Sequence, residues 1–376
     1  MGVTGSIGTQ ALDVLRAAGE AFTLVAVSAG RASDELMAIV RDFAVPRVGV
    51  ATEHDAATLR AALPGVDVLA GPEGLDELSR DADVVINAVV GFAGLPVTLA
   101  ALEAGTTLAL ANKESLIAAA PLVLAAQQRG GGVLVPVDSE HCAIHQCLAS
   151  STEVGHPDVR RLILTASGGP FRSHTAEQLA AVTRDEALRH PTWSMGPKIT
   201  IDSSTLMNKG LEVLEASALF GVEVDRIDVV VHPQSVVHSM VEYVDGSVLA
   251  QLSQPDMRLP IAYCLGWPQR LPQGWGRLDF TQALSLDFSA PDREKFPALD
   301  LAYATARRGG AAPAWLSAAN EVAVAAFLAD SISWSDIVAV VARTMDAYVD
   351  VQLDDVSTLL EQDAKAREVA HGTLKA

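Results

Sequence analysis

The sequence predicts an α/β protein with a doubly wound N-terminal domain, an α+β middle domain and a C-terminal helical bundle. With 376 residues, the chain is too long for one ordinary core. Strand-like apolar runs alternate with helix-period patterns in residues 1–137, as in parallel βαβ units. Residues 293–376 carry helix-period patterns only, which indicates a helical bundle. We therefore expect domains at 1–137, 138–267 and 293–376, with a connector at 268–292.

The elements of the first domain follow from short apolar runs and amphipathic stretches. We expect strands at Thr23–Ser28, Val48–Ala51, Val84–Ala88, Thr107–Ala111 and Val133–Val137. We expect helices at Thr9–Ala18, Ala32–Phe43, Asp55–Ala62, Pro96–Ala104 and Pro121–Arg129. Ligands bind at the carboxyl ends of the strands in such a sheet, so polar residues that directly follow a strand are candidates for function.

The rest of the chain has a different pattern. Arg161–Ala166 and Ile227–Val231 resemble buried strands, and Val236–Tyr243 and Ser247–Ser253 form a predicted hairpin around Asp245-Gly246. Trp267–Pro291 is rich in Pro, Gly and Gln, which indicates the connector. We expect the C-terminal helices at Ala298–Arg307, Leu316–Ala329, Trp334–Ala347 and Val356–Ala370.

Composition limits the function classes. The formal net charge is −19, which argues against nucleic acid or an anionic membrane as the main partner. No apolar run approaches the roughly 20 residues of a membrane span, and we expect no leader before the fold. The three cysteines have no metal-type spacing and indicate reduced, inert core thiols, so we expect a cytoplasmic protein.

The chain opens on a glycine-rich loop, Gly2-Val3-Thr4-Gly5-Ser6-Ile7-Gly8, followed by an amphipathic helix. Such glycines let the backbone approach a pyrophosphate at the helix N-terminus, which favours a Rossmann-like dinucleotide site over an ordinary turn. The same start also fits a myristoylation pattern, which we set aside in favour of the loop. Such a loop normally follows a strand. Either the start is truncated or mis-assigned, or the first strand is absent and the cofactor site is weakened.

Arg31 follows the next expected strand. NAD sites usually hold the ribose 2′-hydroxyl there with an acidic residue, whereas an Arg can pair with a 2′-phosphate. The position therefore favours NADP(H) over NAD(H), unless Arg31 is simply a solvated side chain at a helix start.

Two further polar segments follow expected strands. Asn112-Lys113-Glu114-Ser115 follows one strand, and Asp138-Ser139-Glu140 follows the next. Two carboxylates at i and i+2 can converge on a hard cation such as Mg²⁺ or Mn²⁺. The alternatives are a polar helix start for the first segment and a helix cap before Cys142–Leu148 for the second. A zinc site at His141 and His145 is less consistent with the oxygen ligands beside them.

The stretch His190–Gly196 places Trp193 and Met195 between prolines and a glycine. This pattern favours a hinged loop with an apolar tip, of the kind that closes over a substrate. The alternative is an anchored loop with Trp193 in the core.

A second phosphate-type site is predicted around Asn208, Lys209 and Glu212, at what we read as a helix N-terminus that also includes Ser203. Hydroxyls, backbone N–H groups, an amide and an ammonium there would bind a phosphate. The turn that carries Ser167 could add donors, unless it is simply a tight turn. Gly210 costs about 1 kcal/mol in a helix, so something needs its missing side chain. The alternative is a solvated helix face with an ion pair.

In this order, the segments resemble the 1-deoxy-D-xylulose 5-phosphate reductoisomerase family. The matching segments are TGSIG (4–8), ANKESL (111–116), PVDSEH (136–141), TASGGPFR (165–172), HPTWSMGPK (190–198), MNKGLE (207–212), HPQSVVHSMV (232–241), PDMRLPIA (255–262) and AANEVAVAAFL (318–328). The resemblance implies a homodimer with an NADPH domain, a catalytic domain that also pairs subunits, and a C-terminal helical domain.

The resemblance also assigns residues by role. The metal ligands would be Asp138, Glu140 and Glu212. The substrate contacts would be Lys113, Ser139, Glu140, Ser167, His190, Trp193, Ser203, Asn208, Lys209 and Glu212, with Lys113, Glu140 and His190 catalytic. The cofactor positions would be Thr4, Gly5, Ser6, Ile7, Gly30, Arg31, Ala32, Asn112, Glu114 and Gly196. Val3 and Ala32 depart from the family pattern, which leaves Arg31 as the main candidate for the 2′-phosphate.

The implied reaction is the rearrangement of a phosphorylated sugar around a chelated divalent cation (Mg²⁺ or Mn²⁺, with Co²⁺ as an option), followed by reduction with NADPH. An ordinary NADP-dependent sugar or semialdehyde dehydrogenase is an alternative that needs no metal. A catalytically inactive NADP-binding regulator is another.

Overall fold

The computed structural model describes residues 1–151, 156–193, 195–272 and 274–375, in two compact units. The N-terminal unit contains Met1–Ser115, Val123–Cys142 and Asp256–Gly276, and the C-terminal unit contains Leu116–Leu122, Ala143–Pro255 and Arg277–Ala376. Within the described residues, no helix is long and apolar enough to cross a membrane.

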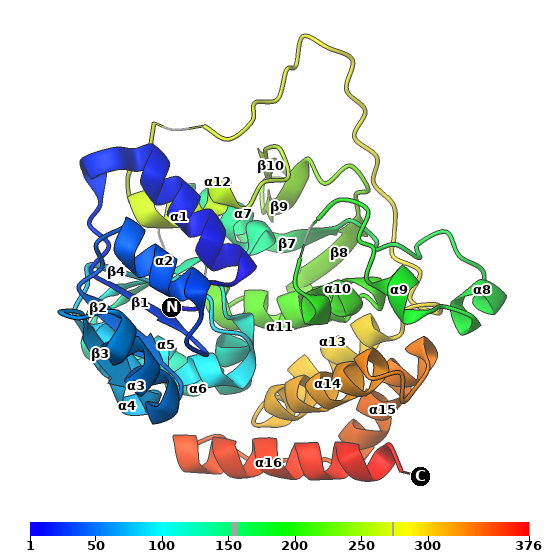
Figure 1. Ribbon diagram of the computed structural model, residues 1–376. Coiled ribbons are helices and arrows are strands. Elements are labelled where there is room, and N and C mark those ends of the chain that lie inside the picture. The colour runs from blue at the N-terminus through cyan, green and yellow to red at the C-terminus, as the bar shows by residue number, and fades with distance from the viewer. Residues whose placement is uncertain (152–155, 194, 273, 376) are drawn as a thin grey trace. The chain divides into compact units, whose positions relative to one another are not determined.

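The N-terminal unit contains six parallel strands in two three-stranded sheets (Figure 1). The strands are β1 (Ala26–Ala29), β2 (Arg47–Val50), β3 (Asp67–Ala70), β4 (Val84–Asn87), β5 (Thr107–Leu110) and β6 (Val133–Pro136). The helices that begin in this unit are α1 (Ser6–Ala18), α2 (Asp34–Asp42), α3 (Glu53–Ala62), α4 (Gly71–Arg80), α5 (Leu95–Glu103), α6 (Lys113–Gly130), α7 (Ser139–Cys147) and α12 (Arg258–Gly266). The predicted parallel α/β class is confirmed.

Residues 1–3 lie between the ends of β1 and β4. The Met1 amino group donates to the Ile86 carbonyl at 2.7 Å, and the Ala88 N–H donates to the Met1 carbonyl at 3.1 Å. On the other side, the N–H groups of Gly2 and Val3 both donate to the Ser28 carbonyl at 2.9 Å. The glycine-rich loop therefore leaves the sheet from the position between the two strands, where a strand that precedes such a loop would end.

Three details of the first unit correct the sequence prediction. Strand β3 and helix α4 were not predicted, because Gly and Pro interrupt the apolar pattern there. Pro72 lies in the first turn of α4, where its missing N–H costs nothing. Helix α6 begins at Lys113 and not at Pro121, which instead lies beside a kink at Ala119.

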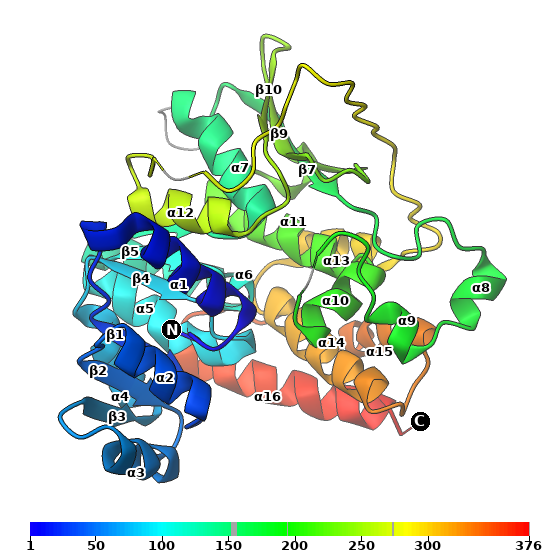
Figure 2. The same ribbon diagram turned by 45° about the horizontal axis from the view of Figure 1, so that its top comes forward.

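The C-terminal unit combines a four-stranded sheet with a helical bundle (Figure 2). Its strands are β7 (Val159–Ala166), β8 (Ile227–Val231), β9 (Val237–Tyr243) and β10 (Val248–Leu252), in the order β10-β9-β7-β8. Its helices are α8 (Ala176–Ala180), α9 (Arg184–Ala187), α10 (Pro197–Ser204), α11 (Met207–Phe220), α13 (Ala298–Arg308), α14 (Ala312–Leu328), α15 (Trp334–Asp346) and α16 (Val356–Thr373). The predicted hairpin β9–β10 and all four predicted C-terminal helices are confirmed.

The C-terminal core is built around α14, whose Trp315 is fully buried. Apolar side chains of α10, α11, α13, α15 and α16 pack on the same cluster. The helix α11 is fixed closely against α13, because a Cβ atom on Gly210 would lie 2.7 Å from the Cβ of Ala302. The missing side chain of Gly210 is therefore needed for helix packing.

Candidate active site

The glycine-rich loop has the geometry of an anion site. Gly2 has a positive φ of 75°, and a Cβ atom there would lie 2.6 Å from the Ala88 carbonyl oxygen. Gly5 is the N-cap residue of α1 and offers no side chain to the first turn. The first amide N–H groups of a helix have no partner within it, so α1 presents oriented donors and its positive dipole end. These features are those expected of a site for an anion such as a pyrophosphate.

The turn after β1 carries the proposed 2′-phosphate residues. Arg31 is exposed, and no atom lies within 4 Å of a Cβ placed on Gly30. The Ala32 N–H, however, donates to Oδ1 of Asp55 at 2.9 Å. Sequence reasoning did not single out Asp55, whose only sequence signal is its place near the start of α3.

Asn112 uses its side chain inside the N-terminal unit. Its Nδ2 donates to the carbonyls of Val89 and Gly91, and its Oδ1 accepts from the Ser115 N–H at 3.1 Å and from the Ser115 hydroxyl. The amide therefore caps α6 and clamps the loop after β4. Because the side chain is used in this way, we expect any contact between Asn112 and a cofactor to involve its backbone.

Asn87 is a second buried amide in the N-terminal unit, and sequence reasoning missed it. Its Nδ2 donates to the Gly94 carbonyl at 2.8 Å and to Thr98 Oγ1 at 2.9 Å. The available signal was an Asn as the last residue of an apolar strand.

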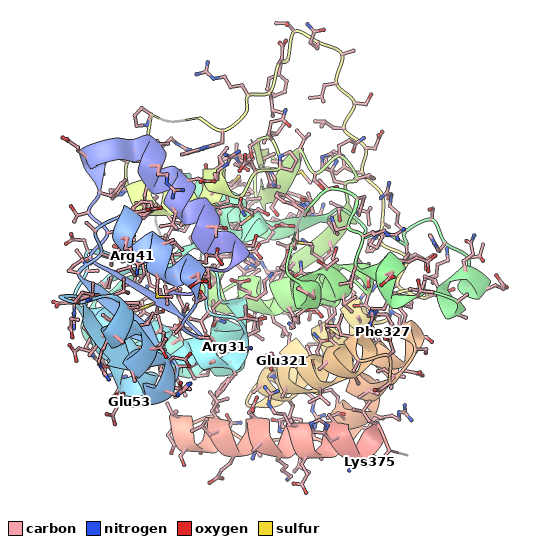
Figure 3. All side chains as sticks on the ribbon, in the orientation of Figure 1. Arg31, Arg41, Glu53, Glu321, Phe327 and Lys375 are labelled. Carbon is pink, nitrogen blue, oxygen red and sulfur yellow. The ribbon has the colours of Figure 1, made fainter. Side chains whose placement is uncertain are left out.

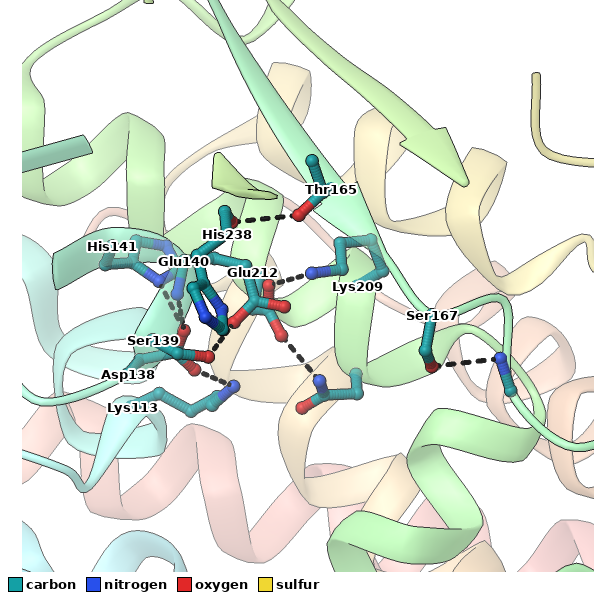
Figure 4. Close-up of polar contacts among 12 residues, drawn as sticks. Lys113, Asp138, Ser139, Glu140, His141, Thr165, Ser167, Lys209, Glu212 and His238 are labelled. Carbon is teal, nitrogen blue, oxygen red and sulfur yellow. Dashed lines mark hydrogen bonds and ion pairs between the residues drawn. The ribbon is translucent and has the colours of Figure 1, made fainter. Parts of the chain in front are cut away.

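Asp138 is a largely buried carboxylate of the N-terminal unit that contacts Lys113 and His141 (Figure 4). Its Oδ2 lies 2.6 Å from Nζ of Lys113, and the two side chains are only 10% and 7% exposed. Its Oδ1 accepts from the Glu140 N–H at 3.2 Å and lies 3.0 Å from Nδ1 of His141. Burial alone would raise the pKa of Asp138, but Lys113 and His141 together hold it well below its ordinary value. Asp138 is therefore an ionised carboxylate, and it also caps the start of α7, as the alternative interpretation of the residue expected.

Glu140 lies beside Asp138 in the first turn of α7. The two residues each offer a carboxylate oxygen, and these oxygens lie within 4.8 Å of each other. Ser139 Oγ donates to Oε2 of Glu140. This donor set, of hard oxygens with no thiolate, fits Mg²⁺ or Mn²⁺. Among the described residues, no group of three or more metal-ligating side chains combines His141 with His145, so the zinc interpretation gains no support.

The C-terminal unit holds a second set of predicted residues on α11. Oε1 of Glu212 accepts from Nδ2 of Asn208 at 2.5 Å, and Oε2 accepts from Nζ of Lys209 (Figure 4). The Lys209 and Glu212 side chains are 4% and 1% exposed. The predicted ion pair exists, but it is buried, which contradicts the solvated-face alternative.

Ser203 lies on α10 and not at the start of α11, which corrects the prediction of one helix N-terminus. The connection between the two helices is a sharp turn in which Leu206 has a positive φ of 59°. The loop of Ser167 packs closely on this turn, because a Cβ on Gly169 would lie 2.6 Å from the Ser203 carbonyl oxygen. Within the C-terminal unit, the turn that carries Ser167 therefore lies against the end of α10, which carries Ser203.

His190 is fixed in one tautomer. Its Nδ1 accepts the N–H groups of Thr192 and Trp193 at 3.1 and 2.9 Å, so the proton of the neutral ring is on Nε2. Nε2–H then donates to Ser167 Oγ at 3.2 Å. Burial lowers the pKa of His190 to about 4, which keeps the ring neutral at pH 7.

Trp193 is only partly buried, and its ring centroid lies 6.4 Å from that of His238. This contradicts the alternative of Trp193 as a core anchor. Ser194, in the same predicted loop, lies outside the described residues.

A buried polar cluster behind α10 was also missed from sequence. Asp202 is 1% exposed, and its carboxylate lies 2.7 Å from Nζ of Lys198 and accepts from Nδ2 of Asn320 at 2.8 Å. Asn320 belongs to the AANE segment, so α14 helps to fix the helix that carries Ser203.

These features describe an α/β fold of the dinucleotide-binding type with a candidate cation site and a candidate phosphate site, a combination expected of a metal-assisted oxidoreductase. The comparisons give the family. Three family models match: 1-deoxy-D-xylulose 5-phosphate reductoisomerase at residues 1–120, its C-terminal domain at 134–220, and the DXP reductoisomerase C-terminal domain at 252–369. The chain belongs to the 1-deoxy-D-xylulose 5-phosphate reductoisomerase family.

The relatives cover nearly the whole chain. The reductoisomerase of Crocosphaera subtropica is 49% identical over 98% of this chain and 94% of its own length. That of Heliobacterium modesticaldum is 48% identical over 98% of this chain and 95% of its own length.

Solved structures agree. The Zymomonas mobilis enzyme in complex with NADPH has a TM-score of 0.93 and 43% identity, covering 100% of this chain and 98% of that one. A DOX-P reductoisomerase with NADPH, fosmidomycin and magnesium has a TM-score of 0.93 and 40% identity, covering 100% of this chain and 97% of that one. The family resemblance inferred from sequence is confirmed.

Proposed function

We propose that this chain isomerises and reduces 1-deoxy-D-xylulose 5-phosphate to 2-C-methyl-D-erythritol 4-phosphate, using NADPH and a divalent cation. The observation that carries the proposal is the ionised carboxylate of Asp138, held by Lys113 beside a dinucleotide-type sheet edge, in a chain 49% identical to reductoisomerases. Neither a simple dehydrogenase nor an inactive regulator accounts for that combination.

Asp138, Glu140 and Glu212 are the proposed ligands of the cation. All three are carboxylates, which Mg²⁺ and Mn²⁺ prefer, and Asp138 is already ionised. When bound, the cation supplies Lewis-acid polarisation of the substrate's carbonyl and hydroxyl oxygens. Lys113 keeps Asp138 oriented, and its Nζ can also donate to a substrate oxygen.

NADPH is the proposed cofactor and supplies the hydride when bound. The loop residues Thr4, Gly5, Ser6 and Ile7 would bind its pyrophosphate through the start of α1. Gly30, Arg31 and Ala32 would face the 2′-phosphate, and Asn112, Glu114 and Gly196 complete the proposed set.

The substrate phosphate would be bound by Ser167, Ser203, Asn208 and Lys209. The Ser167 hydroxyl accepts from His190 and from the Gly169 N–H, so its own hydrogen is free to donate to a phosphate oxygen. His190 is thereby a neutral donor that holds Ser167 and, through Nδ1, the start of the Trp193 loop. Closure of that loop would exclude water from the reacting carbonyl.

We also propose a homodimer formed through β10. This strand is at the edge of its sheet, and Val248 and Leu249 are 48% and 44% exposed. An exposed edge of this kind pairs readily with a second copy. Sedimentation should give a dimer mass, and Leu249→Lys should shift it toward monomer. A wild-type monomer would contradict the proposal.

A cytoplasmic location is proposed as well. Cys142, Cys147 and Cys264 are free and buried, and burial raises the pKa of Cys147 to about 11. Such inert thiols suit a reducing compartment.

The decisive experiment follows NADPH absorbance with 1-deoxy-D-xylulose 5-phosphate, with Mn²⁺ and with excess chelator. We expect oxidation that stops in chelator and returns with Mn²⁺. Full activity in chelator would favour an ordinary dehydrogenase. No oxidation under any condition would favour the regulator.

A further inference from the structure

The turn between β1 and α2 is where dinucleotide folds read the adenosine ribose. In this chain the turn contains Gly30, Arg31 and Ala32. Ala32 has no polar side chain, so its backbone N–H is the group that it can offer to a 2′-phosphate.

That N–H already has an anionic acceptor. Oδ1 of Asp55 accepts it at 2.9 Å, across 23 residues of sequence. The other oxygen of Asp55 accepts the Thr52 hydroxyl, while the Asp55 N–H donates to Thr52 Oγ1 at 3.2 Å. The carboxylate is therefore held in place by contacts with two elements. An anion that binds the Ala32 N–H must therefore displace this carboxylate or share the donor with it.

The surrounding charges add to the effect of Asp55. Asp34 and Glu35 lie in the first turn of α2, and Glu53 lies with Asp55 in the first turn of α3. Arg31, which directly precedes α2, carries a positive charge near these two helix starts, and Figure 3 labels Arg31 and Glu53. Acidic residues are common at helix starts because the positive end of the helix dipole stabilises their charge. Of these four acidic residues, all of which the structure describes, Asp55 is the one that accepts a hydrogen bond from a backbone N–H of the turn.

We propose that Asp55 lowers the preference of this chain for NADPH over NADH. It competes with the 2′-phosphate of NADPH for the Ala32 N–H and repels that phosphate. This inference rests on the proposed use of NADPH and adds a residue that weakens its binding. NADH carries a 2′-hydroxyl there and does not experience the repulsion. The chain therefore discriminates less between NADPH and NADH than Arg31 alone would allow.

The test variant is Asp55→Asn, which keeps an acceptor for Ala32 and removes the charge. We expect the KM for NADPH to fall on the order of 3- to 10-fold, as expected for one like charge removed near a phosphate. The KM for NADH and both kcat values should stay within about twofold, and the gain should shrink at about 0.5 M salt. Glu53→Gln is the matched control, because Glu53 lies in the same helical turn but pairs with Arg60.

Binding without turnover separates the possible failures. The probes are 2′,5′-ADP and 5′-AMP, with the melting temperature of each variant as a check on folding. Asp55→Asn should lower the Kd for 2′,5′-ADP and leave the Kd for 5′-AMP unchanged. Asp55→Ser should have the same effect and replaces Asp55→Asn if that variant is unstable. An equal change in the Kd of both probes, or no change in either, would overturn the role of Asp55. A wild type that neither binds 2′,5′-ADP nor oxidises NADPH would instead refute the proposed function.

Discussion

The two units hold their candidate residues in different ways. In the N-terminal unit, Lys113 and Asp138 each follow a parallel strand, and the pairing of β5 with β6 brings them to 2.6 Å across 25 residues of sequence. In the C-terminal unit, Asn208, Lys209 and Glu212 lie on consecutive turns of one helix. Strand register thus positions the first set, whereas helix packing positions the second.

This difference has a consequence for robustness. A strand-edge site depends on the sheet, and the N-terminal sheet is divided, with residues 1–3 between its halves. A site on α11 depends on how α11 is seated, and Gly210 allows α13 to approach closely. The first site is therefore sensitive to changes in the sheet, and the second to changes in the packing of α11.

The largest expected effect is on turnover. Asp138→Asn and Glu212→Gln should each lower metal-dependent kcat/KM by at least about 100-fold, since even outer groups around a metal cost 10- to 100-fold. Steady-state NADPH oxidation across a Mn²⁺ titration measures this. Asp67→Asn, an exposed carboxylate on β3, is the control and should lose less than twofold. Wild-type rates in either ligand variant would remove that residue from the metal site.

Gly210→Val tests the seating of α11. The added side chain would clash with Ala302, and we expect a loss of about 3 kcal/mol in the free energy of unfolding, at the upper end for overpacking. Urea unfolding measures it, with Gly196→Ala as the control, since no atom lies within 4 Å of a Cβ there. Equal stability of the Gly210 variant and wild type would show that α11 and α13 can separate without cost.

An added strand tests the divided sheet. Four apolar, β-prone residues placed before Met1 would lie between β1 and β4 and supply two or three backbone hydrogen bonds, a gain of about 1–3 kcal/mol. Thermal unfolding of the N-terminal unit measures it, and a Gly-Pro extension of equal length is the control. An equal effect of both extensions would mean that the position between the strands accepts no strand.

The smallest effect is a pH dependence from His190. Its pKa falls from 6.5 to about 4 on folding, because burial disfavours the charged ring. The unfolded chain takes up the proton first, so the folded state loses stability as pH falls from about 6.5 to 4. His190→Asn should lose about 1 kcal/mol less over this range, a value reduced for the partial exposure of the ring. Urea unfolding at each pH measures the free energy of unfolding. The same pH dependence of this free energy in both proteins would contradict the buried neutral form.

Much of the fold could be predicted, because its signals are local. The periodicity of residues 298–373 gave four helices close to their observed bounds. Strand β3 and helix α4 were missed where Gly71 and Pro72 resemble a turn, although they begin the helix. Pro121 misplaced the start of α6 for the opposite reason, since a kinked helix continues through it.

For the candidate site, the sequence alone determined the residue types and their order, from the glycine-rich loop to Asn208, Lys209 and Glu212, and with them the family. These features are local, so a linear pattern carries them. Only the tertiary structure decided that Asp138 is paired with Lys113, that Gly210 serves packing, that His190 is neutral, and that Asp55 accepts the Ala32 N–H. Each of these depends on contacts between distant residues and on burial, and burial sets the charge state of an ionisable group.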